Sequence, residues 1–333
     1  MAELALEPAD GAADDAAWDA LVARSPQGTL FAESAFLRAV GCPHQRWWVR
    51  QGQAVKAGLL LPTSADGRAV VADDLVIHAG PLLDLDPARQ EVKRRHDAFA
   101  LCEFLAAELP RRFERIELPL APQVDDLRPF LWHAYHGPQD QQYRPDLRYT
   151  SYLDIAALAS AAPDEAEASA CFEAMETVRR YSVREARKKG GRVAVVRDTA
   201  PLLGYYRALM QAQGEAPPED KLAAMQRVMD GLIARARGAM FHVHAADGTL
   251  LYCVFYGWDA RRAYYLYGAG HPQASAPWQG TLAHWAAFGH LAREHGVREV
   301  DLEGVNSPQR GWFKLSFGGR LVPYHTLRWG PAA

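Results

Sequence analysis

The sequence has few cysteines and places them without a recognisable pattern. Its four cysteines, Cys42, Cys102, Cys171 and Cys253, lie far apart and form no C-x-x-C pair. This spacing argues against a disulfide framework and against a cysteine-based zinc site. It favours a reducing compartment, so we expect a cytoplasmic protein.

Long apolar runs and an excess of positive charge are also missing. No apolar run approaches the roughly 18 residues that a membrane span needs, so we expect no role for a membrane. The N-terminal residues MAELALEPADGAADDAAW are acidic and lack the basic and apolar regions of a secretory signal. The formal net charge is -3, whereas a protein whose whole surface binds nucleic acid is usually basic. Any contact with RNA must therefore be made by a local patch.

The length and composition indicate a globular protein with two domains. The chain has 333 residues, of which 49% are hydrophobic and 23% are charged. Domains usually have roughly 100–200 residues, so two are expected. We expect a flexible lead-in over residues 1–25, an N-terminal domain over 26–148 and a C-terminal domain over 149–328.

The C-terminal third has the clearest pattern of predicted elements. Strands over 240–245 and 250–257 form a hairpin through Asp247-Gly248, and a third strand covers 262–268. There follow an amphipathic helix over 278–295, a strand over 299–303, a short helix over 312–317 and a strand over 321–327. This order is that of the GNAT acyltransferase fold, although one fold can support many chemistries.

Four segments share their order and motifs with a known family. They are GTLFAESAFLRAVG (28–41), HAGPLLD (78–84), METVRRYSVREARKKGGRV (175–193) and residues 267–322, which include YGAGHPQAS, DLEGV and FKLSFG. Together they resemble the FemAB family of aminoacyl and acyl transferases. The resemblance implies an α/β (α+β) fold with two GNAT-like acyltransferase domains in tandem. It also implies an aminoacyl-tRNA donor, an amine acceptor, and an acyl-transfer site at Lys314, the lysine of the F-K motif.

Lys314 is the first candidate for a catalytic residue. Amide formation needs a positioned donor carbonyl, stabilisation of its oxyanion and an unprotonated amine. We find no Ser-His-Asp or Cys-His arrangement, which favours direct attack by the acceptor over a covalent intermediate. Lys314 lies between Phe313 and Phe317 and could stabilise an oxyanion or a phosphate. Alternatively, it is a surface lysine whose stem covers the core.

Asp301 and Glu303 are candidates for the general base. They lie two residues apart on the predicted strand, so their side chains are expected to share a face. Two carboxylates on one buried face raise one pKa and can accept a proton from an incoming ammonium. A salt bridge from one of them to Lys314 or Arg310, with no chemical role, is the more common arrangement.

A basic run could bind phosphate. Residues 179–192 contain seven cations and one acid, Glu185. Arg180, Arg184 and Lys188 share one side of the helix predicted over 171–189. This is the one local patch that could meet the phosphate of tRNA, coenzyme A or a nucleotide-linked acceptor. Charge runs are, however, commonly solvated helix faces.

Aromatic residues near the F-K motif could line a binding groove. Tyr265, Tyr267, Trp278 and Phe313 could hold an acyl group or stack on a base, although core packing is the more common role. The Q/R-x-x-G-x-G/A loop expected of a GNAT enzyme that uses coenzyme A is absent, since residues 275–280 are SAPWQG. This departure lowers the expectation of plain acetyl-CoA use.

A metal site is not expected. His242 and His244 share one face of a predicted strand, but the spacing supplies no convincing third ligand from His271 or Asp247. We also find no heptads that would mediate dimerisation, which favours a monomer.

Three functions fit these features. The first is transfer of an aminoacyl group from aminoacyl-tRNA to an amine of a small molecule or peptide by direct attack. The second is an acyl-CoA-dependent N- or O-acetyltransferase acting on a sugar, a polysaccharide or a metabolite. The third is a non-catalytic GNAT-like binding module. In the first two, the tRNA or the coenzyme A thioester is a co-substrate, and no resident cofactor is expected.

Overall fold

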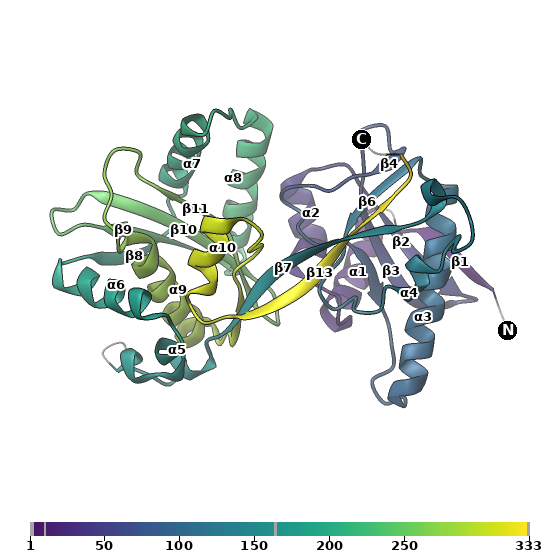
Figure 1. Cartoon of the computed structure of the whole chain (residues 1–333), viewed down its shortest axis with the longest axis horizontal. Coiled ribbons are helices and arrows are strands. Elements are labelled where there is room, and N and C mark those ends of the chain that lie inside the picture. The colour runs from purple at the N-terminus through teal and green to yellow at the C-terminus, as the bar shows by residue number, and fades with distance from the viewer. Residues whose placement is uncertain (1–2, 10, 163–164, 332–333) are drawn as a thin grey trace. The chain divides into compact units, whose positions relative to one another are not determined.

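The computed structural model describes residues 3–9, 11–162 and 165–331, which form two compact units (Figure 1). Unit 1 contains the described residues up to Arg148 and those from Pro323 onward, and unit 2 is Tyr149–Val322. Two long strands, β7 (Arg144–Asp154) and β13 (Arg320–Trp329), have residues in both units. In unit 1, β13 pairs antiparallel with β6 (Arg115–Pro119). The assignment of residues 323–328 to the C-terminal domain is therefore wrong.

The described residues of unit 1 form a four-stranded antiparallel sheet and four α-helices. The sheet order is β1 (Leu4–Pro8), β2 (His44–Gln51), β3 (Ala54–Pro62) and β5 (Gly80–Leu83), while β4 (Ala69–Val70) pairs parallel with β6. The α-helices are α1 (Ala12–Arg24), α2 (Ser34–Val40), α3 (Glu91–Glu108) and α4 (Arg128–Leu131). Short 3-10 helices are η1 (Leu30–Ala32), η2 (Leu109–Arg111) and η3 (Gln139–Gln141).

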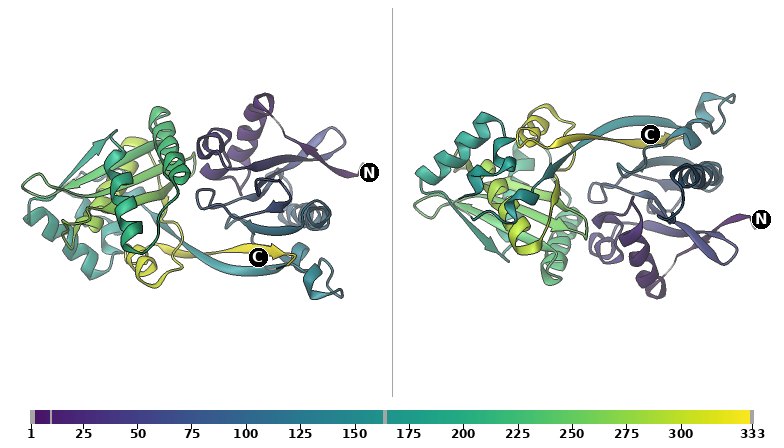
Figure 2. Two further views of the ribbon diagram at one scale, coloured as in Figure 1. Left: turned by 90° about the horizontal axis from the view of Figure 1, so that it is seen from above. Right: turned by 90° about the horizontal axis from the view of Figure 1, so that it is seen from below.

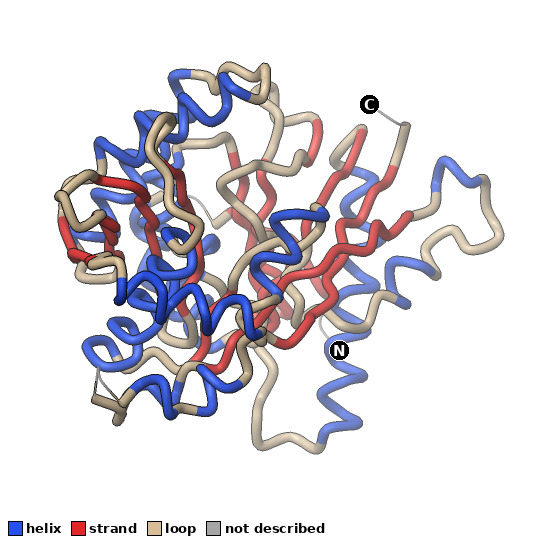
Figure 3. Tube along the Cα trace, turned by 60° about the vertical axis from the view of Figure 1, so that its left-hand side comes forward, coloured by secondary structure: helices blue, strands red, loops and turns tan. Residues whose placement is uncertain are grey.

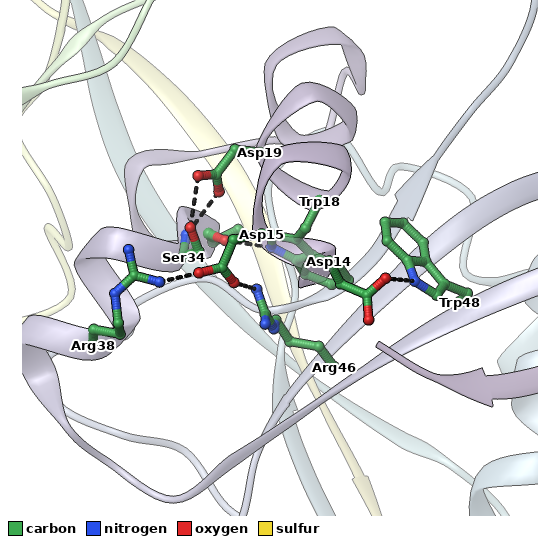
Figure 4. Close-up of polar contacts among 9 residues, drawn as sticks. Asp14, Asp15, Trp18, Asp19, Ser34, Arg38, Arg46 and Trp48 are labelled. Atoms are coloured by element: carbon green, nitrogen blue, oxygen red, sulfur yellow. Dashed lines mark hydrogen bonds and ion pairs between the residues drawn. The ribbon is translucent and has the colours of Figure 1, made fainter. Parts of the chain in front are cut away.

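Residues 3–9 and 11–25 include β1 and α1 and belong to the folded unit, so the prediction of a flexible lead-in over residues 1–25 is wrong for them, while residues 1, 2 and 10 lie outside the described residues. Trp18, Leu21 and Val22 lie on one face of α1 and are buried, because spacings of three and four residues place side chains together on a helix. The Trp18 indole donates to the Ala32 carbonyl oxygen at 2.8 Å. Figure 4 shows Asp15, on the same helix, paired with Arg46, with 2.8 Å between the nearest atoms. The Ala- and Asp-rich composition had concealed this amphipathic pattern.

Trp18→Phe tests the role of this helix. The substitution removes the indole donor and leaves the buried Ala32 carbonyl oxygen without it, which should lower the free energy of unfolding by about 1–3 kcal/mol. Chemical denaturation of the full chain measures the change. Trp132→Phe is the control, because Trp132 is 53% exposed. Equal stability of the two variants would contradict a structural role for α1.

The predicted order of three antiparallel strands, a helix, a strand, a helix and a strand is confirmed. All of these elements lie in unit 2 except β13, of which only residues 320–322 do. The sheet order is β7, β12 (Glu299–Asp301), β11 (Ala263–Gly270), β10 (Leu250–Trp258), β9 (Gly238–His244) and β8 (Arg192–Val196). The α-helices are α5 (Ala170–Glu173), α6 (Thr177–Lys188), α7 (Ala200–Ala212), α8 (Glu219–Ala234), α9 (Gln279–His295) and α10 (Pro308–Leu315). The described part of the unit also includes the 3-10 helices η4 (Ala156–Leu158) and η5 (Ala166–Ala168). The helix predicted over 171–189 is thus divided into α5 and α6.

Two features of this unit position the site. Helices α6 and α9 pack together on one face of the sheet, and α7 and α8 cover the other (Figures 2 and 3). Strands β11 and β12 are parallel neighbours over only two residue pairs, Ala263 with Val300 and Tyr264 with Asp301. The carboxyl end of β12 is therefore free to present side chains at the point where the ladder stops. Among the described residues, no helix has both the length and the hydropathy needed to cross a lipid bilayer.

Candidate active site

The three predicted catalytic residues lie together at the carboxyl end of β12. Asp301 is fully buried and Glu303 is 8% exposed. Asp301 Oδ1 accepts hydrogen bonds from the Thr150 hydroxyl and, at 2.8 Å, from the backbone N–H of Glu303. The Lys314 ammonium donates to the Gly304 carbonyl oxygen at 3.2 Å and interacts electrostatically with both carboxyl groups. The structure thus brings one partly buried cation and two buried carboxyl groups into one cluster.

The side chains of Asp301 and Glu303 are brought together by a turn in the backbone and not by the predicted strand. Strand β12 ends at Asp301, and Glu303 has a φ of 60°, in the left-handed region that non-glycine residues seldom adopt. The alternation of side chains along a strand therefore does not apply to Glu303. Its turned backbone instead directs its N–H to the Asp301 carboxylate. The prediction that both residues lie on the strand is wrong, although they are neighbours.

Burial shifts the pKa of all three groups. The pKa of Asp301 rises to about 6 because burial disfavours its charge, although the hydrogen bond from Thr150 opposes this. The pKa of Glu303 is raised well above its ordinary value by burial and then by the charge of Asp301. Burial lowers the pKa of Lys314, while the two carboxylates oppose this change. Asp301 therefore ionises first, and its charge retains the proton on Glu303.

One oxygen of each carboxyl group has no hydrogen-bond partner among the described residues. These atoms are Asp301 Oδ2 and Glu303 Oε1, and both are buried. A buried acceptor without a donor is costly, and most such atoms in proteins are paired. The two oxygens are consequently available to a donor such as the ammonium or amine of a bound molecule.

Tyr265 and Phe313, both predicted to bind substrate, lie beside this cluster. The Lys314 Nζ atom is 5.1 Å from the centroid of the Tyr265 ring. Tyr265 and Phe313 also contact the buried His284 ring, with centroids 4.6 Å and 5.6 Å away. The Arg179 guanidinium lies 4.9 Å from the centroid of the Phe313 ring. Aromatic rings thus border the ammonium group and limit its contact with water.

Sequence reasoning missed Arg179 and His284 as neighbours of the site. Arg179 shares a helix face with the buried residues Val183 and Ala186, at spacings of four and seven, which could have distinguished it from Arg180. His284 lies on α9 four residues before the buried Phe288, and this spacing was the available signal. Its Nδ1 is 2.5 Å from the Tyr256 hydroxyl oxygen, and burial lowers its pKa to about 3. His284 is therefore neutral at physiological pH.

Tyr267 is not part of the site, so that prediction is wrong. The hydroxyl of Tyr256 faces α9, so the adjacent Phe255 faces the other side of the sheet. The Tyr267 ring stacks on Phe255 with centroids 6.4 Å apart. Phe255 pairs with Tyr267 and Tyr256 pairs with Tyr265, so the register between β10 and β11 shifts by one residue at this point. This bulge places Tyr265 and Tyr267 on opposite faces although they are two residues apart.

The predicted phosphate-binding residues of α6 have partners outside the Lys314 cluster or are exposed. The Arg184 guanidinium is bonded to Glu167, with 2.8 Å between Nε and Oε2, and lies over the Phe172 ring. Arg180 donates to the Thr177 hydroxyl at 3.3 Å. Lys188 is exposed at the end of α6. Arg184 and Lys188 are exposed to solvent, while Arg180 is half-buried. The cation of the run whose contact with the site is described is Arg179, over the Phe313 ring.

Trp278 and the paired histidines lie elsewhere in unit 2. Trp278 directly precedes α9, is 6% exposed and lines a surface groove rather than the Lys314 cluster. The His242 and His244 rings are 6.2 Å apart. Within the described ranges, no group of three or more His, Cys, Asp or Glu side chains is arranged to hold a metal ion.

Comparison with known proteins supports an acyltransferase. Residues 177–310 match the model of a family described as acetyltransferase (GNAT) domain. This match confirms the prediction of an acyltransferase enzyme. It covers most of unit 2, including Asp301 and Glu303. No curated protein matches the chain.

Solved structures show the fold of the whole chain. FemX has a TM-score of 0.61 and 15% identity, over 93% of this chain and 95% of that one. A tandem GNAT protein from the clavulanic acid biosynthesis pathway has a TM-score of 0.55 and 15% identity, over 99% and 100%. The C-terminal domain of a putative lysylphosphatidylglycerol synthetase from Agrobacterium fabrum has a TM-score of 0.53 and 14% identity, over 96% and 93%. The chain therefore has a FemAB-like tandem GNAT fold, which confirms the predicted fold class.

Proposed function

We propose that this acyltransferase forms amides, moving an aminoacyl group from aminoacyl-tRNA to an amine of a small molecule or peptide. The observation that carries the proposal is the cluster of Lys314, Asp301 and Glu303. It combines a cation with two carboxyl groups, each of which has one oxygen without a partner among the described residues. Amide formation by direct attack needs both parts, because a proton must leave the acceptor and negative charge develops on the donor.

The carboxyl groups account for the protons. Asp301 Oδ2 takes one proton from the acceptor ammonium, and the resulting amine attacks the ester carbonyl carbon. A C–N bond forms, the tetrahedral oxyanion collapses, and the C–O bond to the ribose 3′-oxygen breaks. Glu303 gives its proton to that oxygen and receives the second proton from the nitrogen. The products are the amide, the free 3′-hydroxyl and one proton, which Asp301 releases to water.

Lys314 supplies the positive charge that this sequence of steps needs. Its ammonium is held by the Gly304 carbonyl oxygen and bordered by the Tyr265 ring, so its position is fixed before the substrate arrives. A charge fixed in an environment of low dielectric stabilises an oxyanion more strongly than one in water. Tyr265 and Phe313 provide the apolar surface against which the acyl group packs.

An acyl-CoA-dependent N- or O-acetyltransferase acting on a sugar, polysaccharide or metabolite is the second candidate. The specific observation that favours it is the match of residues 177–310 to a domain described as an acetyltransferase. The same three residues would serve, with a C–S bond breaking in place of the C–O bond. For either donor, we propose a cytoplasmic monomer that uses its donor as co-substrate and has no resident cofactor.

Radiolabelled aminoacyl transfer with and without RNase tests the donor. Loss of transfer after RNase treatment is expected, and activity that persists would remove tRNA from the proposal. Thermal unfolding with acetyl-CoA and longer acyl-CoAs tests the second candidate, since a ligand at 100 times its Kd stabilises by about 2.7 kcal/mol. No turnover with any donor would favour a non-catalytic binding module.

A further inference from the structure

The hydrogen bonds described for the Asp301 carboxyl group both end on the same oxygen. Oδ1 accepts from the Thr150 hydroxyl and from the backbone N–H of Glu303. The other oxygen, Oδ2, is buried and has no partner among the described residues. A hydrogen bond to a carboxylate stabilises its charged form. The two donors therefore favour ionisation of Asp301 and leave Oδ2 as the atom that can take a proton.

The end of the β7–β12 ladder places Thr150 beside Asp301. Asp301 pairs with Tyr152 in the antiparallel register, so Thr150, two residues along β7, has its side chain on the same face of the sheet. A continued ladder would set Glu303 opposite Thr150. The left-handed backbone of Glu303 ends the regular pairing and turns its N–H to Asp301. The Thr150 hydroxyl, which is buried, therefore meets the Asp301 carboxylate.

The cations near this pair do not distinguish one carboxyl group from the other. Lys314 and Arg262 lower the pKa of Asp301 and also that of Glu303. Thr150 is the described side chain that donates a hydrogen bond to one of the two carboxyl groups alone. The titratable and charged groups that interact electrostatically with Asp301 are Glu303, Tyr264, Arg262 and Lys314.

We propose that Thr150 is a positioning residue that decides which of the two buried carboxyl groups is ionised, and so makes Asp301 the group that takes the proton. The inference rests on the proposed function, in which the proton passes from the acceptor nitrogen to Oδ2 of Asp301. During this step Oδ1 retains its hydrogen bonds from the Thr150 hydroxyl and the Glu303 N–H. Without the hydroxyl, the charged form of Asp301 loses a donor, and Glu303 competes with it for the negative charge.

Thr150→Val tests this role, because it removes the hydroxyl and keeps the branched shape of the side chain. The inflection in the pH–rate profile, near 6 in the parent enzyme, should move upward by about one to two pH units, the effect of losing one hydrogen bond to a charged group. The direction is upward because Asp301 then holds its proton at higher pH, where it cannot act as a base. Thr150→Ser keeps a hydroxyl donor and should retain the inflection near 6.

Thr199→Val is the matched control. Thr199 is also in unit 2, is 4% exposed and has its hydroxyl oxygen 3.5 Å from a carboxylate oxygen of Asp230, outside the Lys314 cluster. The control should retain the inflection. Thr150→Cys offers only a weak S–H donor and should shift the inflection in the same direction as Thr150→Val, which provides a second test where the valine variant does not fold.

NMR titration of the full chain, labelled at the side-chain carboxyl carbon of aspartate, gives a measurement that does not depend on activity. Asp301→Asn identifies the signal by its loss. An upward shift of this titration in Thr150→Val or Thr150→Cys, absent from Thr150→Ser and Thr199→Val, supports the inference. An unchanged titration in the variants that fold, or an equal shift in Thr199→Val, overturns it. If the titration moves and the pH–rate profile does not, Thr150 controls the charge of Asp301, and the role of Asp301 in the proposed function is refuted.

Discussion

Lys314→Met is expected to lower kcat by about 10²–10³, the loss found when one group that stabilises an oxyanion is removed. Methionine has a similar length and retains the packing against Tyr265, so the change chiefly removes the charge. Without that cation, burial keeps Asp301 and Glu303 protonated more strongly, which adds to the loss. Single-turnover kinetics with saturating donor measures the chemical step, and circular dichroism checks the fold.

Arg310→Met is the control for this experiment. Arg310 lies four residues before Lys314 on α10 and is also a cation, but its side chain is exposed. Its replacement should change kcat by no more than a small factor. If the two variants had equal kcat values, Lys314 would have no role in stabilising the oxyanion.

The sequence could predict Lys314, Asp301 and Glu303 because they belong to local motifs near the carboxyl end. The F-K motif identified the lysine by resemblance, and the spacing of the carboxylates indicated that they meet. The geometry of that meeting could not be predicted, because it depends on the left-handed backbone at Glu303. Such a conformation is stabilised by surrounding structure and has no signature in a single sequence.

Tyr267 shows a second limit of sequence patterns. Tyr265 and Tyr267 were both predicted to line a binding groove, but a single extra residue in β11 places them on opposite faces of the sheet. The bulge arises from pairing with β10, a neighbour that local periodicity does not describe. Arg179 shows the opposite case, since its spacing from Val183 and Ala186 did indicate an inward position. There, the excess of charge in the run had drawn attention to the solvated face.

The composition of the N-terminal segment was misleading for a related reason. Alanine and aspartate around Trp18 suggested a loose segment. The helix α1 needs only a narrow apolar face, however, because only one of its sides packs on the rest of unit 1. Tertiary contacts then stabilise a helix whose own sequence has little apolar character.

Asp301→Asn is expected to lower kcat by about 10²–10⁴, the usual contribution of a general base. Asparagine retains an oxygen that can accept from the Thr150 hydroxyl and from the Glu303 N–H, so the backbone arrangement should persist. The amide nitrogen that replaces Oδ2 cannot take a proton from the acceptor. The variant should therefore fold but fail to deprotonate the acceptor.

The pH dependence distinguishes a general base from a structural role. Because the pKa of Asp301 is raised to about 6, the group is protonated below that pH and cannot accept a proton. The parent enzyme should lose rate as pH falls through about 6, and Asp301→Asn should lack this inflection in its residual rate. Glu299→Gln is the matched control, since Glu299 lies two residues earlier on β12 and pairs with Arg262. It should retain both the rate and the inflection. An inflection near 6 that survives in Asp301→Asn would assign the titration to another group and leave Asp301 with a structural role only.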